Sequence, residues 1–162
     1  MLKLMRCDDR LIHGQCTTVL VQEHNIRAIV VVDDEAANNP ILRTVYETAA
    51  SGIPTTVCTV AKAEEKVRMA MESPTATLLL VKQPQSCLAL MNKVEGLPQQ
   101  LNIGPMSKRP GTVAATRTIH LLPEEAHAIE ELTQKGVRVY FQQVPTEKAV
   151  EWSEVRAKFI KS

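Results

Sequence analysis

The sequence contains no long apolar run. Every apolar stretch falls short of the ~18 consecutive residues that a membrane-spanning helix needs. The first five residues are also too few for the apolar region of a secretory signal, and Arg6 ends them with a charge. We therefore expect a soluble cytoplasmic protein.

Neither sign of charge is in excess, and no cysteine motif is present. Nineteen Lys and Arg against eighteen Asp and Glu give a formal net charge of +1, so no overall field attracts nucleic acid or an anionic membrane. The four cysteines form no Cys-x-x-Cys pair and no metal-ligand spacing with histidine. We expect no metal site, and thiols that stay reduced.

No internal repeat, low-complexity tract or linker divides the chain, so we expect residues 1–162 to form one domain. Short β-rich runs alternate with amphipathic stretches, a pattern typical of the α/β class. It predicts an open, mostly parallel twisted sheet of about seven strands with helices on both faces. Strands are expected at Leu2–Cys7, Arg27–Asp33, Thr55–Thr59, Ala76–Val81, Leu101–Gly104, Arg117–His120 and Val137–Gln142, and helices at Gln15–Glu23, Pro40–Ala50, Ala61–Glu72, Pro84–Val94, Pro123–Lys135 and Glu147–Phe159.

An irregular basic loop interrupts this alternation at Gly104–Thr116. Two prolines, Lys108 and Arg109 lie in it. Lys108 and Arg109 are candidates for docking an acidic partner surface, and a merely solvated loop is the alternative.

The segment Arg6–Gln15 carries the strongest chemical signal. It follows the first expected strand and leads into a helical pattern, so His13 falls in a strand-to-helix loop. In open α/β sheets, reacting groups gather beyond the carboxyl ends of the strands. The start of a helix also favours a neutral imidazole, which is a nucleophile toward phosphorus, over an imidazolium. A solvated surface histidine is the alternative.

The neighbours of His13 suit a phosphoryl group. Backbone N–H groups at Gly14 and Gln15 would cradle its oxygens. Arg10, and with it Arg6, would clamp those oxygens and stabilise the charge during in-line transfer. Asp8 or Asp9 would hold the arginines, or orient the imidazole through its second nitrogen.

Asp33 and Asp34 offer two other interpretations. An acid at a strand end binds a ribose in dinucleotide-binding folds, but no Gly-x-Gly-x-x-Gly follows the first strand. A magnesium-dependent phosphoacceptor aspartate would leave His13 without a role and lacks a lysine at a late strand end. A third alternative is a non-catalytic regulatory module that keeps the loop only as an anion-binding site.

The loop resembles a known family signature. Arg6-x-Asp8-Asp9-Arg10-Leu11-Ile12-His13-Gly14-Gln15 is similar to the signature of the IIB components of the mannose/sorbose family of the bacterial sugar phosphotransferase system. Further similar blocks follow in the family's order and span nearly the whole chain. They are Ile29–Ala37, Leu101–Ser107, Gly136-Val137 and Gln143–Thr146.

The resemblance implies a function. His13 would be phosphorylated on the ring nitrogen nearer the main chain by a histidine of a IIA component. The phosphoryl group would then pass to a sugar held by the membrane components IIC and IID, which place the protein at the inner face of the membrane. Neither a metal nor a cofactor is expected, since arginines and helix-end amides supply positive potential. Members of the family often pair, so a homodimer is a further expectation. Within the resemblance, Asp33 and Asp34 cap the following segment.

Overall fold

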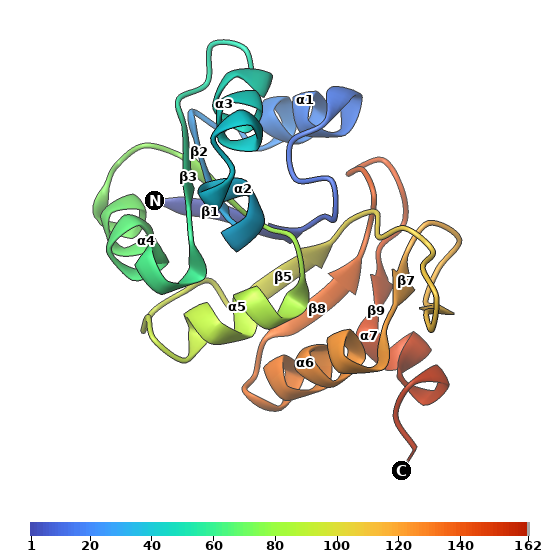
Figure 1. Ribbon diagram of the computed structural model, residues 1–162. Coiled ribbons are helices and arrows are strands. Elements are labelled where there is room, and N and C mark those ends of the chain that lie inside the picture. The colour runs from blue at the N-terminus through green and yellow to red at the C-terminus, as the bar shows by residue number, and fades with distance from the viewer. Residues whose placement is uncertain (162) are drawn as a thin grey trace.

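The computed structural model describes residues 1–161, and its centre is a seven-stranded sheet with the order β3-β2-β4-β1-β5-β8-β9 (Figure 1). All neighbouring strands are parallel except β9, which runs antiparallel to β8. This confirms the predicted open, mostly parallel α/β sheet. The strands are β1 (Leu2–Cys7), β2 (Ala28–Val32), β3 (Thr55–Cys58), β4 (Thr77–Val81), β5 (Gln100–Ile103), β8 (Arg138–Phe141) and β9 (Val150–Glu151).

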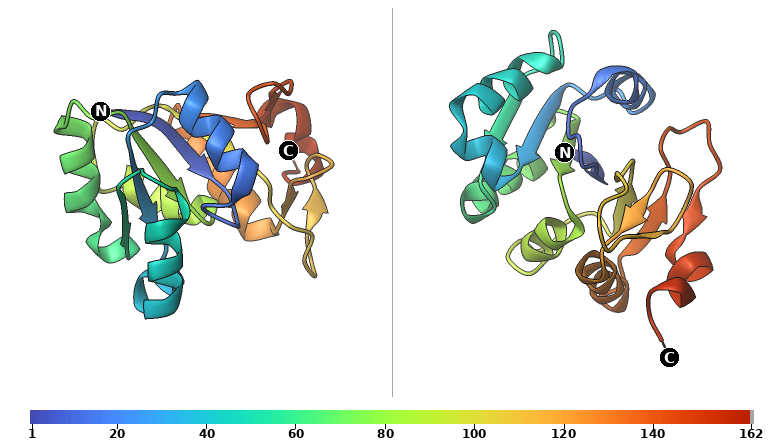
Figure 2. Two further views of the ribbon diagram at one scale, coloured as in Figure 1. Left: turned by 90° about the horizontal axis from the view of Figure 1, so that it is seen from above. Right: turned by 45° about the vertical axis from the view of Figure 1, so that its right-hand side comes forward.

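Helices cover both faces of the sheet, as the views in Figures 1 and 2 show. The α-helices are α1 (Gly14–Glu23), α2 (Asp34–Asn38), α3 (Pro40–Ala49), α4 (Ala63–Glu72), α5 (Pro84–Met91), α6 (Pro123–Gln134) and α7 (Trp152–Val155). Single 3₁₀ turns span Val60–Lys62 and Arg156–Lys158. Within residues 1–161, no helix has both the length and the apolar character that crossing a membrane requires.

Two apolar cores pack on the two faces, because successive side chains of a strand point to opposite sides. On one face, Leu78 and Leu80 of β4 pack with Leu20 of α1. On the other, Leu79 and Val81 of the same strand pack with residues of α4, α5 and α6. All five residues of β4 are buried, which explains why its sequence is nearly continuously apolar.

One short helix had no counterpart among the predicted segments. The Asp33 carboxylate accepts a hydrogen bond from the Ala36 backbone N–H, which starts α2. The Asn39 side chain then caps α3, so two caps divide the segment into two helices. The expected capping by Asp33 is therefore confirmed, while the Asp34 carboxylate accepts from the Val60 backbone N–H.

Two predicted elements were wrong. The expected strand Arg117–His120 does not form as one element of the main sheet. Arg117 and Thr118 are irregular, Ile119 forms a single parallel bridge with Met106, and His120 begins β7 (His120–Leu121), which pairs antiparallel with β6 (Val113–Ala114). The expected helix Glu147–Phe159 starts instead as β9, which completes the edge beside β8. Its apolar pattern marks Trp152 and Val155, which are buried in short helical turns.

The topology brings several loops to one edge of the sheet. The loop after β1 and the loop after β5 both leave the carboxyl ends of adjacent parallel strands. The segment after β8 leaves the same edge, one strand further along. Residues distant in sequence therefore meet around the segment Asp8–His13.

Candidate functional site

His13 lies in the loop between β1 and α1, as predicted, and is the residue that precedes the first turn of α1. Its backbone is extended, with φ −154° and ψ 127°. The Thr17 hydroxyl accepts a hydrogen bond from the His13 backbone N–H at 3.0 Å and donates one to the His13 carbonyl at 3.3 Å. These two bonds fix the main chain of His13, so the side chain leaves the loop in a defined direction.

Asp8 orients the imidazole of His13. The Asp8 Oδ2 lies 2.9 Å from the His13 Nε2, and its Oδ1 accepts a hydrogen bond from the Arg10 backbone N–H at 3.1 Å. An ionised carboxylate only accepts hydrogen bonds, so Nε2 carries the proton and Nδ1 keeps its lone pair. The Asp8 side chain is 2% exposed, whereas the His13 side chain is 18% exposed. Asp8 thus bonds to the ring from the protein interior, and the ring remains partly exposed to solvent.

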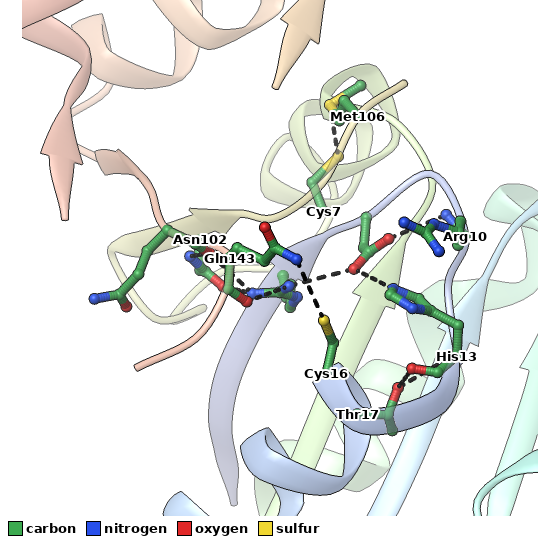
Figure 3. Close-up of polar contacts among 11 residues, drawn as sticks. Cys7, Arg10, His13, Cys16, Thr17, Asn102, Met106 and Gln143 are labelled. Carbon is green, nitrogen blue, oxygen red and sulfur yellow. Dashed lines mark hydrogen bonds and ion pairs between the residues drawn. The ribbon is translucent and has the colours of Figure 1, made fainter. Parts of the chain in front are cut away.

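Arg6 lies beneath Asp8 and is only 1% exposed. Its Nη2 donates to the Asp8 Oδ2 at 3.3 Å and to the Gln143 carbonyl at 2.8 Å. Its Nη1 donates to the Asn102 Oδ1 and to the Gln142 carbonyl (Figure 3). The expectation that Arg6 clamps phosphoryl oxygens is therefore wrong, because burial keeps its donors inside the protein. The expectation that Arg6 helps to orient the His13 imidazole, through its hydrogen bond to Asp8, stays a prediction.

Arg10 differs from Arg6 in being exposed. Its main chain is tied to Asp8, whereas its guanidinium makes no hydrogen bond or ion pair within residues 1–161. Figure 3 shows Arg10 beside His13, and both bond to the one carboxylate of Asp8. The Arg10 side chain is thus exposed to solvent in the loop that carries His13.

Asp9 forms no hydrogen bond or ion pair with His13. Its Oδ2 accepts a hydrogen bond from the Ser107 backbone N–H at 2.6 Å, and its own N–H donates to the Pro105 carbonyl at 3.2 Å. Asp9 therefore joins the loop after β1 to the loop after β5. Of the two aspartates, Asp8 is the one that meets the imidazole.

Gly14 and Gln15 form the exposed first turn of α1. Gly14 has a φ of +42°, which L side chains rarely adopt, and a Cβ built there would meet nothing within 4 Å. Both residues also line a groove of about 490 Å³ that lies between α1 and the segment Ala49–Ile53. The first backbone N–H groups of a helix have no partner within the helix, so this exposed turn offers donors to a ligand or partner.

In the basic loop after β5, Arg109 forms an ion pair and Lys108 is exposed to solvent. Arg109 forms a two-pronged ion pair with the buried Glu125, at 3.0 and 3.1 Å, and also donates to the His120 carbonyl. The hydrogen bonds that Arg109 donates to the Glu125 carboxylate raise the pKa of Arg109. Lys108 is exposed. Arg109 thus anchors the loop to α6, and Lys108 remains the candidate for docking.

Four contributors to this site come from segments that the sequence did not assign to it. Asn102 and Gly104 lie at the end of β5, and the carbonyls of Gln142 and Gln143 follow β8. The polar Asn102 between the apolar Leu101 and Ile103 was the available signal. Within residues 1–161, no group of three or more His, Cys, Asp or Glu side chains is arranged to hold a metal ion.

Comparison with known proteins identifies similar chains along almost the whole length. Residues 2–161 match the protein family described as "PTS system sorbose subfamily IIB component". The chain is 31% identical over 148 residues to the sorbose-specific EIIB component of Klebsiella pneumoniae, covering 91% of this chain and 90% of that one. The crystal structure of the IIBSor domain of the sorbose permease from Klebsiella pneumoniae superposes with a TM-score of 0.90 at 28% identity, over 99% of this chain and 98% of that one. The mannose-specific EIIAB component of Escherichia coli (strain K12) is 28% identical over 161 residues, which are 98% of this chain and 49% of that protein.

Proposed function

The chain belongs to the sorbose-subfamily IIB components of the sugar phosphotransferase system, and we propose that His13 is its phosphoryl carrier. A histidine of a IIA component donates the group, and a sugar bound by the membrane components IIC and IID receives it. Family membership implies IIA and IIC/IID partners in general. We further propose that residues 1–162 act as one cytoplasmic domain at the inner face of the membrane.

The observation that carries the proposal is the bond between His13 Nε2 and the Asp8 carboxylate. With the proton held on Nε2, the lone pair of Nδ1 is free to attack phosphorus. The Nδ1–P bond forms as the N–P bond of the donor histidine breaks, and the electron pair of that bond returns to the donor ring. In the second transfer a sugar hydroxyl attacks phosphorus, the Nδ1–P bond breaks, and the hydroxyl proton leaves to solvent or to a base of the membrane partner.

The phosphoryl group would be held by positive groups of this chain. The exposed Arg10 guanidinium offers a planar fork for two oxygens. The N–H groups of Gly14 and Gln15 at the start of α1 add helix-end potential. These donors suit the charge that develops on the equatorial oxygens during in-line transfer.

The two transfers require two partners at one place. A phosphoryl group passes only when both reacting atoms come within about 3–3.5 Å. The donor and the membrane acceptor must therefore each cover His13, one after the other. A relative named as an EIIAB component joins A and B in one chain, which supports a IIA domain as the donor.

The proposal is tested by phosphoryl transfer to the whole protein. IIA carrying ³²P-phosphohistidine is mixed with this chain, and the product is divided between acid and base. We expect label that survives base and is lost in acid, with mass spectrometry placing it on His13. No label, together with simple binding of free phosphate, would instead favour the alternative of an anion-binding module.

We expect Lys108 to guide the donor. Lys108→Glu should slow association with IIA at low salt and have little effect at high salt, because exposed charges act through a screened field. Arg109 is left intact, since changing it would break its pair with buried Glu125. The measurement is the transfer rate as a function of IIA concentration and ionic strength.

The matched control is Lys93→Glu, the same charge change on an exposed residue between α5 and β5. That segment enters β5 from the opposite edge of the sheet, away from His13. Equal transfer rates at low salt for the Lys108 and Lys93 variants would show that the basic loop is not part of the docking surface.

A further inference from the structure

We propose that Asn102 and Gly104 of the β5 end are positioning residues for His13, acting through Arg6 and Asp8. This inference rests on the proposed function of His13. It assigns to the β5 end a specific task, which is to hold the imidazole as the tautomer whose free nitrogen is Nδ1. Neither residue touches the ring, and both act on the buried guanidinium below it.

Most of the acceptors that surround Arg6 are uncharged. The guanidinium is fully inside the protein, yet within residues 1–161 Asp8 is the one carboxylate with which it forms an ion pair. The other acceptors of Nη1 and Nη2 are the Asn102 amide oxygen and two main-chain carbonyls. A buried charge is tolerated only when its donors are satisfied. The amide of Asn102 is therefore a substantial part of what keeps the guanidinium in place.

Strand pairing and a second hydrogen bond place Asn102 beside Arg6. Arg6 and Asn102 are direct partners in the parallel pairing of β1 with β5. Asn102 is 2% exposed, and its Nδ2 donates to the Gln142 carbonyl at 3.1 Å. That same carbonyl accepts from the Arg6 Nη1 at 3.1 Å. Arg6, Asn102 and the Gln142 carbonyl thus close a triangle of hydrogen bonds, which determines where the guanidinium points.

Gly104 leaves space for the Arg6 guanidinium. A Cβ built on Gly104 would lie 2.5 Å from the Arg6 Cζ and 2.9 Å from its Nε, and it would also clash with Nη2. The backbone of Gly104 needs no positive φ, so its conformation does not call for glycine. The missing side chain serves to let the guanidinium lie against the main chain. Any larger residue would push Arg6 out of this position.

Arg6 is linked to the reacting imidazole through Asp8. The Asp8 Oδ2 is shared between the Arg6 Nη2 at 3.3 Å and the His13 Nε2 at 2.9 Å. When Arg6 moves, Asp8 loses the contact that aims Oδ2 at the ring. The neutral imidazole then samples both tautomers, and its Nε2 also becomes a nucleophile. Asn102 and Gly104 would thus determine which nitrogen carries the phosphoryl group.

The test compares Asn102→Ala and Gly104→Ala with Val139→Ala. Val139 is a buried residue of the neighbouring strand β8 that makes no polar contact with Arg6. Two-dimensional ¹H–¹⁵N spectra establish that each variant is folded. Truncation of Asn102 leaves a space that water can fill, which makes Asn102→Ala the decisive variant.

The first readout is the ¹⁵N chemical shift of the two His13 ring nitrogens at alkaline pH. Wild type should show one protonated nitrogen, Nε2, and one bare nitrogen, Nδ1. The tautomer ratio is the population of the form protonated on Nε2 divided by that of the form protonated on Nδ1. In Asn102→Ala and Gly104→Ala we expect this ratio to fall roughly fivefold to tenfold, which corresponds to the loss of about one hydrogen bond. Val139→Ala should keep the wild-type ratio, because loss of packing does not reach Asp8. Asn102→Asp keeps an acceptor for Arg6 and should restore most of the ratio.

The second readout is the site of phosphorylation, measured by ³¹P NMR with phosphoramidate as the donor. Attack by a ring nitrogen breaks the P–N bond of phosphoramidate and releases ammonia, so no partner protein is involved. Wild type should carry the group on Nδ1, and the Asn102 and Gly104 variants on both nitrogens. Folded Asn102→Ala with wild-type tautomer ratio and a single phosphorylated nitrogen overturns the inference. The tautomer measurement requires no donor, so failure of IIA to phosphorylate wild type would count against the proposed function alone.

Discussion

His13→Gln is expected to abolish phosphoryl acceptance from IIA, with no label above background in a time course that saturates wild type. Glutamine offers a donor to Asp8 but no nucleophilic nitrogen, so the substitution separates hydrogen bonding from chemistry. Mass spectrometry on the wild type and the variant measures the effect. Label that persists in His13→Gln would place the carrier elsewhere.

The same variant should remain folded. The His13 side chain is partly exposed, and Asp8 keeps its contacts with Arg6 and with the Arg10 backbone when the ring is gone. We expect a loss of about 1 kcal/mol or less in the free energy of unfolding. His24→Gln, at the opposite end of α1, is the matched control and should accept the phosphoryl group from IIA at the wild-type rate. A large loss of stability in His13→Gln alone would mean that the ring is structural.

Much of the fold could be predicted because its strands and helix starts have local signals. The nearly continuous apolar runs of β2 and β4 mark strands covered on both faces. Pro84 and Pro123 stand at the first residues of α5 and α6, where a missing N–H costs nothing. These signals are local, so they can be interpreted before any long-range contact is known.

The elements that could not be predicted depend on tertiary contacts. The two residues of β9 become a strand because β8 offers an open edge. The following turns are short because Trp152 stacks on Phe159 and packs near Phe141. An apolar periodicity over Glu147–Phe159 identifies the buried side chains, but it does not distinguish one long helix from a strand followed by single turns.

The candidate site likewise contains residues whose proximity could be predicted from the sequence and residues whose proximity depends on tertiary contacts. His13, Asp8 and Arg10 lie within six consecutive residues, so their proximity follows from the chain itself. Asn102 meets Arg6 only through the pairing register of β1 with β5, and register is not visible in either segment alone. The burial of Arg6 has the same origin, which is why the sequence suggested a phosphate clamp where the fold places a support for Asp8.

Arg10→Ala is expected to slow transfer from IIA to this chain by roughly two to three orders of magnitude, the usual effect of losing one preorganised charge at a transition state. The guanidinium is exposed and unengaged within residues 1–161, so its removal should leave the free energy of unfolding almost unchanged. The Arg10 backbone N–H that supports Asp8 is retained in every substitution except proline. Rapid-quench measurement at saturating IIA isolates the chemical step from docking.

Arg10→Lys separates charge from geometry. Lysine keeps the positive charge but offers a point donor in place of a planar fork, so its rate should fall between those of wild type and Arg10→Ala. Arg27→Ala is the matched control, since Arg27 is an exposed arginine just before β2, at the opposite edge of the sheet. Its rate should equal that of wild type. If Arg10→Ala also transfers at the wild-type rate, the phosphoryl oxygens are held by the amides of α1 alone, and Arg10 contributes to the site only through its backbone.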